Sequence, residues 1–343
     1  MVTQEFSKLY YRTANCLTSD IIADFAPVSR IVGVDTSAGL GTVFTAMGTR
    51  FDMQYVAKEA FMATDSYESD TRSIDDTPVN EIMRYVRHEI IEGDMVPEAY
   101  KPIVEAAKTG SCIYNQYKET KSGNEDADIL FLISPAAPDA AKTAEQFSIV
   151  SKTIEKSVYC TNQYKDCGYL ALQMGLFDEA TKQINLLKKQ MQQYNVVVTD
   201  DSYILDALLV LAPEMAEKIR FIDEFVMEYK NTLKLSENET IMLHQSGVIE
   251  RLYPEKSVDY KELFASAKIV TPARCGYDVT DSGLAGGLGL AVPENLMAIS
   301  GRRMADLMKE EHDVIITPCA YEAVGLNCAE KEKVITLLDY ICK

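Results

Sequence analysis

The feature of this chain that most constrains its fold is an internal repeat across its C-terminal two-thirds. Four short segments recur in the same order, at offsets of 108 to 118 residues. The pairs are Asp128–Ile133 with Glu239–His244, Asp166–Tyr169 with Arg274–Tyr277, Asn195–Asp201 with Asp313–Cys319, and Ile222–Val226 with Leu337–Ile341. A tandem duplication explains one shared order better than chance, so we expect two similar domains in succession.

Length, composition and charge exclude several classes of protein. With 343 residues and 47% hydrophobic residues, the chain is expected to form two or three packed domains. A formal net charge of -18 repels phosphate backbones, so nucleic acid is excluded as an expected partner. No apolar run approaches the ~18 residues of a membrane span, and the polar start is unlike a secretory signal. We therefore expect a cytoplasmic protein without a transmembrane segment.

Within each repeat, the spacing of apolar residues alternates between strand and helix patterns. Short apolar runs predict strands at 129–133, 196–199, 240–243, 269–271 and 314–317. Helical spacing predicts helices at 177–194 and 293–311. This alternation favours an α/β fold with a small parallel sheet in each repeat. The carboxyl ends of such strands form the ligand crevice, and Thr199–Asp201 and Thr317–Cys319 stand there.

The eight cysteines are scattered along the chain. They stand at positions 16, 112, 160, 167, 275, 319, 328 and 342, and no two of them form a CxxC motif. Such single thiols argue against a zinc ribbon or a ferredoxin loop, in which ligands cluster in sequence. Buried structural cysteines are the leading expectation.

The Cys-Gly after a loop and the Thr-Pro-Cys after a strand resemble the cysteine-rich "CCG" repeat family. That family includes the CCG-repeat subunits of heterodisulfide reductase and of anaerobic glycerol-3-phosphate dehydrogenase, and iron–sulfur subunits of lactate and glycolate oxidation. The framework is similar over residues 126–343, including the glycine-rich stretch Gly283–Gly289. The resemblance implies two tandem small parallel-sheet CCG-type domains, at 126–236 and 237–343.

In that family, each repeat holds an iron–sulfur cluster through up to five cysteines. The resemblance places Pro135 or its neighbour, Asp166, Cys167, Asp201 and Ile204 at the first-repeat ligand positions. It places His244, Arg274, Cys275, Cys319 and Glu322 at those of the second repeat. Since a four-iron cluster generally needs four thiolates, no cofactor is expected. The alternative is one atypical iron–sulfur cluster, and any metal would be held by Cys275 and Cys319.

The first 125 residues resemble a ferredoxin-like, mainly helical domain whose cluster ligands are missing. Pro78–Arg87, Glu92–Tyr100 and Thr109–Asn115 are similar to the helical tail of a two-cluster ferredoxin module. The two cysteine-rich loops of that module correspond to Asp35–Gly41 and Ala63–Asp70, which contain no cysteine. Carboxylates and hydroxyls replace soft thiolates poorly, so both of these clusters are expected to be absent.

The whole chain thus looks like a fusion of the ferredoxin-type and CCG-repeat subunits of heterodisulfide reductase without their clusters. The first hypothesis is a non-catalytic scaffold or regulatory subunit of a redox complex. Its expected partners are iron–sulfur or flavin subunits, including an active homologue of this chain. The second is an electron-transfer or thiol/disulfide oxidoreductase subunit, with one unconventional centre in the second repeat.

Several features have simpler explanations. Cys275 and Cys319 would form a thiol pair if they converge on one crevice, but buried remnants of an ancestral site are the commoner state. Arg274 would activate Cys275 or pair with Glu322 or Asp278, and pairing is favoured. The stretch Gly283–Gly289 lacks the lysine of a phosphate-binding loop, so nucleotide binding is disfavoured there.

Overall fold

The computed structural model describes residues 53–62, 79–233, 235, 238–329 and 334–343. Contacts between residues divide the chain into two compact units. The smaller unit contains residues up to 111 together with 170–179 and 283–299. The larger unit contains 112–169, 180–282 and 300–343. The boundaries expected after residues 125 and 236 stay predictions.

The first sheet of the larger unit has five strands in the order β1-β3-β2-β4-β5. They are β1 (Lys121–Gly123), β2 (Ile129–Leu132), β3 (Val158–Thr161), β4 (Val196–Thr199) and β5 (Ile219–Phe221). All neighbours pair in parallel except β1, which is antiparallel to β3 at the edge. Strand β2 is buried along its whole length, as expected for a central strand covered on both faces.

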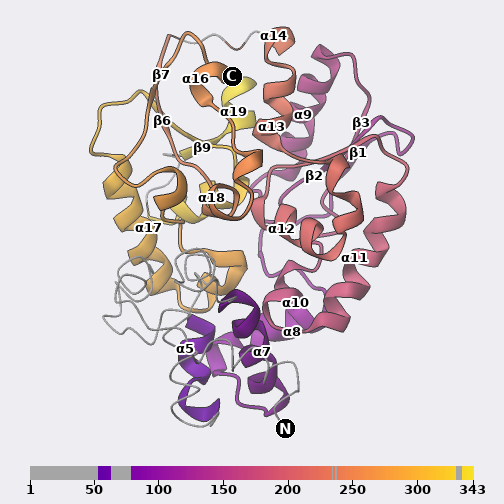
Figure 1. Ribbon diagram of the computed structural model, residues 1–343, viewed down its shortest axis with the longest axis vertical. Helices are drawn as coiled ribbons and strands as arrows, with labels where there is room; N and C mark the ends of the chain where they lie inside the picture. The colour runs from indigo at the N-terminus through magenta and orange to yellow at the C-terminus, as the bar shows by residue number, and fades with distance from the viewer. Residues whose placement is uncertain (1–52, 63–78, 234, 236–237, 330–333) are drawn as a thin grey trace. The chain divides into compact units, whose positions relative to one another are not determined.

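The second sheet of the same unit has four strands in the order β7-β6-β8-β9, and all of them are parallel. They are β6 (Thr240–Leu243), β7 (Lys268–Val270), β8 (Val314–Thr317) and β9 (Val334–Thr336). Figure 1 shows these strands in the orange to yellow part of the chain. The protein is therefore mixed α/β, with mostly parallel sheets.

The four parallel strands of each sheet have the same order. In each, the first parallel strand lies between the second and the third, and the fourth is at an edge. The fourth pair of repeated segments forms α13 (Ile222–Glu228) and α19 (Leu337–Ile341), each directly after the edge strand of its sheet. Repeated sequence segments therefore occupy equivalent places in two equivalent sheets, which favours an origin by duplication.

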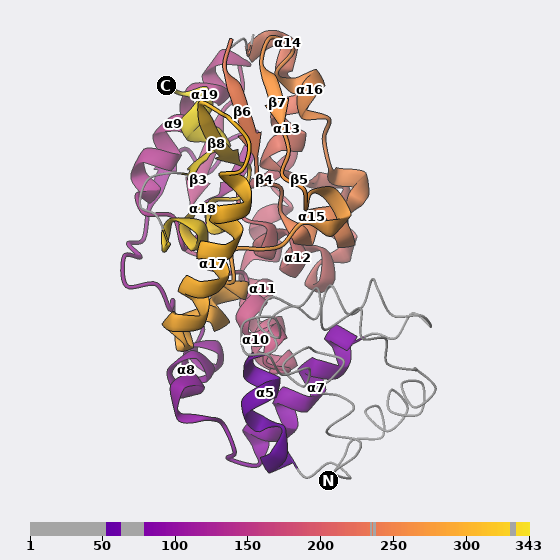
Figure 2. The same cartoon turned by 90° about the vertical axis from the view of Figure 1, so that its left-hand side faces the viewer.

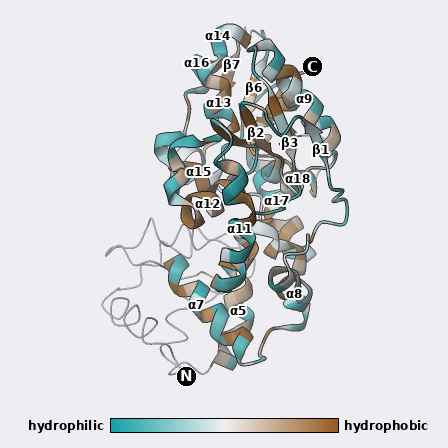
Figure 3. Cartoon of the chain, turned by 90° about the vertical axis from the view of Figure 1, so that its right-hand side faces the viewer, coloured by the Kyte–Doolittle hydropathy of each residue, from teal (hydrophilic) through white to brown (hydrophobic). Residues whose placement is uncertain are grey.

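Helices and short 3-10 turns connect the strands. Those of the first repeat are α9 (Ala140–Thr153), α10 (Tyr169–Gln173), α11 (Phe177–Met191), α12 (Ser202–Leu211), η4 (Pro213–Lys218), α13 and α14 (Lys230–Leu233). Those of the second are α15 (Gly247–Leu252), η5 (Pro254–Lys256), α16 (Tyr260–Leu263), η6 (Gly276–Asp278), η7 (Ala285–Ala291), α17 (Pro293–Leu307), α18 (Ala320–Asn327) and α19. Figure 3 shows hydrophilic and hydrophobic residues alternating along α11, as its amphipathic spacing predicts.

Each sheet of the larger unit has its own apolar packing. In the first repeat, Phe131 of β2 stacks on Phe147 of α9 with ring centroids 4.0 Å apart, and Phe225 of α13 lies 5.5 Å from Phe147. In the second, a buried cluster joins strands β6, β8 and β9 to α17 and α18. Its members are Met242, Met304, Leu307, Ile315, Ala323, Leu326 and Val334.

The described part of the smaller unit is helical. It contains η2 (Met53–Tyr55), α5 (Ala57–Met62), α7 (Val79–Glu92), η3 (Glu98–Tyr100) and α8 (Lys101–Thr109), with η7 and the start of α17. Helices α5 and α7 are drawn in indigo and purple in Figure 2. The buried Arg87 of α7 donates to the carbonyl oxygens of Ala60 and Gln173, at 2.9 and 3.0 Å.

The glycine-rich stretch of the smaller unit is a tight turn. Gly286 and Gly287 have φ of 65° and 101°, where glycine is favoured. A Cβ atom on Gly289 would lie 2.1 Å from the carbonyl oxygen of Gly283. Close backbone packing therefore accounts for the glycines.

The five strands and two helices expected from the sequence are confirmed, to within a few residues at their ends. Four strands of the two sheets, β1, β3, β5 and β9, were not expected. The loops Asp35–Gly41 and Ala63–Asp70 lie outside the described residues.

Candidate functional site

In each sheet, there is one pair of neighbouring strands from whose carboxyl ends the connections run to opposite sides. This is the switch point of the sheet. With this strand order, the point lies between β2 and β4 in the first repeat and between β6 and β8 in the second. Asp201 follows β4, while His244 and Cys319 follow β6 and β8. The sequence-based candidates therefore stand at the two switch points of the larger unit, where ligands of such sheets are usually found.

At the first switch point, buried hydrogen bonds link the ends of β2 and β4. Ser134 donates its backbone N–H to Asp200 Oδ1 at 2.9 Å and its hydroxyl to Asp201 Oδ2 at 2.5 Å. Asp201 Oδ1 accepts the backbone N–H groups of Tyr203 at 2.9 Å and Ile204 at 3.3 Å. Asp201 is thus the N-cap of α12, and both of its carboxyl oxygens are used inside the fold.

Burial controls the acidity of this aspartate pair. It raises the pKa of Asp200 to about 7. It raises the pKa of Asp201 to about 6, while the hydrogen bonds from Ser134, Tyr203 and Ile204 act in the opposite direction. The carboxyl groups of Asp200 and Asp201 are therefore protonated in part near neutral pH.

Asp166 and Cys167 stand near this cluster, in a tight turn. Cys167 and Gly168 have φ of 57° and 91°, and Asp166 Oδ1 accepts the Gly168 N–H at 3.2 Å. Burial first, and then the carboxylates of Asp166 and Asp201, raise the pKa of the Cys167 thiol well above its usual value. The first-repeat candidates Asp166, Cys167 and Asp201 are thus electrostatically coupled, and Cys167 stays a neutral thiol.

At the second switch point, His244 and Glu322 form a buried pair. His244 Nε2 lies 3.0 Å from Glu322 Oε2, which also accepts the backbone N–H of Ser282 at 2.8 Å. Arg303 donates from Nε and Nη2 to His244 Nδ1, both at 3.2 Å. Because Nδ1 is the acceptor, the network assigns the ring proton to Nε2, which donates to Glu322.

Arg303 connects this pair to the remaining second-repeat candidates. Its Nη1 donates to the carbonyl oxygen of Arg274 at 3.0 Å and to Asp306 Oδ2 at 3.1 Å. Burial lowers the pKa of Arg303 to about 10, and Cys275 is among the groups that oppose this shift. Cys275 is partly buried, directly before η6. Arg274 therefore contributes its backbone to the network, and Cys275 lies within electrostatic reach of Arg303.

The protonation states follow from burial and from this network. Burial, and then the Arg303 guanidinium, hold the pKa of His244 well below its usual value. Burial raises the pKa of Glu322 to about 7, against the hydrogen bonds from Ser282. His244 is thus a neutral donor to Glu322 at neutral pH, and Arg303 carries the positive charge.

Cys319 lies where the two repeats meet. It is the N-cap residue of α18, as Asp201 is of α12. Its sulfur lies 3.4 Å from the hydroxyl of Ser202, and the N–H of Ala320 donates to the carbonyl oxygen of Asp200 at 2.8 Å. Burial, then Asp201 and Glu322, raise the pKa of the Cys319 thiol well above its usual value. The starts of α12 and α18 therefore adjoin, and the thiol between them is neutral.

The donor set does not fit a four-thiolate iron–sulfur cluster. The second repeat offers the two thiols of Cys275 and Cys319, and the facing atoms of His244 and Glu322 are bonded to each other. Within the described ranges, all seven cysteines are free, and no group of three or more His, Cys, Asp or Glu side chains is arranged to hold a metal ion.

Two residues of these networks, Ser282 and Arg303, were missed by sequence reasoning. Two others, Ser134 and Asp200, were covered only indirectly. Ser134 is the neighbour of Pro135, which the resemblance placed at the strand end, and Asp200 precedes an expected site residue. Arg303 stands 59 residues from His244 on a helix, and its position gives no sequence signal.

Comparisons with known family models, curated proteins and solved structures find no match to this chain. Among the described residues, no helix is both long and apolar enough to cross a membrane.

Proposed function

We propose that this chain is a non-catalytic, cluster-poor homologue of a heterodisulfide-reductase-like iron–sulfur subunit, acting as a scaffold or regulatory subunit of a multi-subunit redox complex. The observation that carries the proposal is that polar side chains at several of the expected ligand positions are engaged in internal hydrogen bonds. Asp201 caps α12 and accepts from Ser134, and Glu322 accepts from His244 and Ser282. Groups used in this way stabilise the fold, instead of being directed at a ligand.

The energetics of buried polar groups support this role. A buried carboxylate with its partners contributes modestly to stability, but removing one partner costs about 3–5 kcal/mol. Glu322 has the backbone N–H of Ser282 and the neutral ring of His244 as donors. Charged and hydrogen-bonding side chains can therefore fill former ligand positions without loss of the fold, provided that they pair with each other.

The contacts between the repeats support a rigid docking body. Asp339 of the second repeat accepts from Lys142 at 2.6 Å and from Gln146 at 3.0 Å, both on α9 of the first repeat. On another side, the hydroxyl of Tyr260 donates to the buried Asp223 at 2.6 Å. Two repeats joined at several places present a fixed surface, which is what a scaffold subunit requires.

The test of this proposal is anaerobic purification, followed by iron and acid-labile sulfide assays and a visible spectrum. We expect less than about 0.1 iron per chain and no thiolate-to-iron absorbance near ~400 nm. Stoichiometric iron that is lost in both Cys275→Ser and Cys319→Ser would overturn the proposal.

A second measurement tests the scaffold role itself. The chain is co-expressed with the iron–sulfur and flavin subunits of a heterodisulfide-reductase-like complex. The mass of the resulting assembly is measured by native mass spectrometry. We expect one defined assembly whose electron-transfer rate is unchanged in the Cys275→Ser, Cys319→Ser double variant. A rate lost in that variant would favour the alternative, a subunit with an unconventional redox or thiol centre in the second repeat.

One observation keeps that alternative worth testing. Cys275 is only partly buried, and it lies close enough to Arg303 to act on its pKa. A partly exposed thiol within electrostatic reach of a guanidinium is an environment in which reactive cysteines are found.

A further inference from the structure

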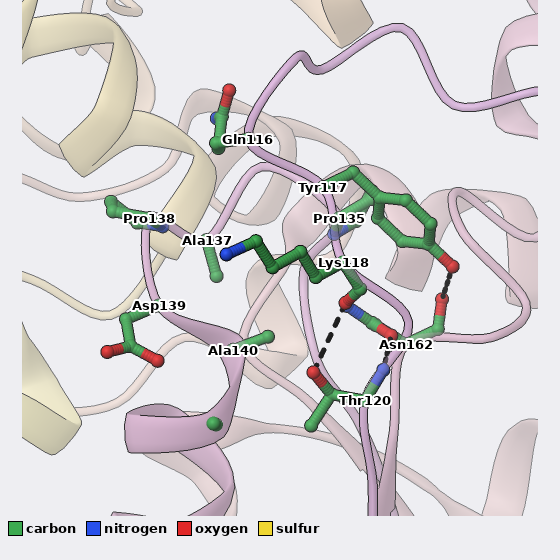
Figure 4. A pocket seen from close by; sticks show the side chains of 11 residues that line it. Gln116, Tyr117, Lys118, Thr120, Pro135, Ala137, Pro138, Asp139, Ala140 and Asn162 are labelled. Atoms are coloured by element: carbon green, nitrogen blue, oxygen red, sulfur yellow. Dashed lines mark hydrogen bonds between the residues drawn. The ribbon is translucent and has the colours of Figure 1, made fainter.

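A pocket of about 370 Å³ opens in the larger unit, beside the carboxyl ends of β2 and β3. Its lining residue Pro135 directly follows Ser134 of the first switch-point cluster. Three segments line it, namely residues 116–120, the β2–α9 connection and Asn162 after β3 (Figure 4). Its volume is within the range of small-molecule sites, and its place follows the rule that ligands of parallel sheets bind at the carboxyl ends of strands.

Hydrogen bonds hold the wall of the pocket in place. Asn162 Nδ2 donates to the carbonyl oxygen of Lys118 at 2.9 Å, and Asn162 Oδ1 accepts the N–H of Thr120 at 2.7 Å. The hydroxyl of Tyr117 donates to the carbonyl oxygen of Asn162 at 3.2 Å. On the other side, Gln116 Nε2 donates to the carbonyl oxygen of Ala136 at 3.1 Å. The pocket is therefore formed before any ligand arrives, which lowers the cost of binding.

The pocket carries one cation and one anion, Lys118 and Asp139. In Figure 4 the side chain of Lys118 extends toward the segment that contains Ala137 and Pro138. Among the described residues, Lys118 is exposed and forms no ion pair. Asp139 accepts the backbone N–H of Lys142 at 3.0 Å through Oδ1, which leaves Oδ2 for another donor. The ammonium of Lys142 is bound instead to Asp339.

Part of the pocket's lining is small and apolar. The side chains there are those of Pro135, Ala137, Pro138, Ala140 and Ala141. Methyl groups and pyrrolidine rings leave room for the side chain of a small ligand, and they form no hydrogen bonds with it.

We propose that this pocket binds a small zwitterion of the α-amino-acid class. Its carboxylate pairs with Lys118, its ammonium group pairs with Asp139, and its side chain lies on the proline and alanine wall. A ligand with only one of these groups would leave the opposite charge of the pocket without a partner. This proposal is independent of the scaffold role, because neither Lys118 nor Asp139 belongs to the hydrogen-bonded clusters at the switch points.

The test is isothermal titration calorimetry of the whole chain with free L-amino acids. Each is compared with its N-acetyl derivative, which lacks the ammonium, and with its amide, which lacks the carboxylate. We expect at least one small amino acid to bind, and both of its derivatives to bind about tenfold more weakly or worse. Binding by no amino acid, or equal binding by the N-acetyl derivative, would overturn the proposal.

Two variants locate the site. Lys118→Met keeps the length of the side chain and removes its charge, and Asp139→Asn removes the charge while asparagine still caps α9. We expect each to weaken binding about tenfold, with an unchanged unfolding temperature. The matched control is Lys189→Met, on the exposed face of α11 outside the pocket. Unchanged binding in both pocket variants, or an equal loss in the control, would also overturn the proposal.

Discussion

Glu322 Oε2 lies 3.0 Å from His244 Nε2, and both side chains are almost completely buried. The two residues come from helix α18 and from the end of strand β6. Arg303 fixes the tautomer from the far side of the ring, so the histidine acts as a neutral donor to the carboxyl group. Removing one side chain from this series of hydrogen bonds leaves its neighbours buried and unpaired.

The first prediction concerns this chain of hydrogen bonds. Glu322→Ala leaves the N–H groups of His244 and Ser282 buried without an acceptor, and we expect a loss of about 3 kcal/mol in the free energy of unfolding. Glu322→Gln keeps an acceptor oxygen at the same place, so its loss should be below about 1 kcal/mol. Urea unfolding at pH 7 measures both. Equal losses in the two variants would mean that the hydrogen bonds contribute little.

The second prediction is that the fold loses stability as the pH rises from about 5 to 7. Burial raises the pKa of Asp200, Asp223 and Glu322 to about 7 each, whereas carboxyl groups in an unfolded chain titrate near 4. A raised carboxyl pKa stabilises the fold fully below the unfolded value, and this contribution is lost on rising toward the folded value. Each group accounts for a loss on the order of 2–3 kcal/mol. His244, whose pKa is lowered, acts in the opposite direction below its usual value.

Urea unfolding at pH 5.0, 6.0 and 7.0 checks this dependence. In Asp200→Asn and Asp223→Asn, one titrating group is removed, so the slope of stability against pH should become shallower in each. An exposed control, Asp126→Asn, should retain the slope of the natural chain. A stability that rises over this range in the natural chain would contradict the prediction.

The fold was largely readable from the sequence because the repeated segments coincide with its central strands. Runs such as Ile129–Leu132 and Val196–Val198 are uniformly apolar, which is typical of strands buried on both faces. Strand β5 was missed because it has three residues and Arg220 in the middle. So short a segment has no measurable period, and its pairing with β4 decides its structure.

Part of the candidate site could also be predicted from the sequence. The rule that strand ends gather ligands pointed to Asp201 and Cys319 without any knowledge of their contacts, whereas His244 was expected only from the resemblance to the CCG family. The partner Arg303 comes from a helix distant in sequence, and only the packing of α17 brings it to His244. Contacts between side chains of different helices and strands depend on that packing. The spacing of residues along a single helix or strand does not predict them.

The third prediction concerns the order in which thiols react. Cys275 is partly buried and Cys328 is exposed, whereas Cys167 and Cys319 are buried. Since a buried thiol reacts only after local opening, we expect iodoacetamide to modify Cys275 and Cys328 at least about 100-fold faster than the other two. Peptide mass spectrometry of timed samples gives the four rates. Fast modification of Cys319 in the folded chain would mean that the joint between the repeats opens readily.

The last prediction compares two glycines at the same position of the two repeats. Gly168 and Gly276 both follow the repeated cysteine, and both have positive φ, at 91° and 55°. A Cβ atom on Gly168 would lie 2.9 Å from the carbonyl oxygen of Ala180, whereas on Gly276 its nearest neighbour is 4.0 Å away. Backbone strain acts in both Ala variants, but the steric clash acts only in the first.

We therefore expect Gly168→Ala to cost about 3 kcal/mol and Gly276→Ala about 1 kcal/mol in the free energy of unfolding. Urea unfolding of both variants under one set of conditions gives the comparison, and Gly301→Ala in α17 serves as a control, because a Cβ there has its nearest neighbour at 3.9 Å. Equal costs at the two repeat positions would show that strain alone governs them. A larger cost at Gly276 would contradict the packing described around the second Cys-Gly turn.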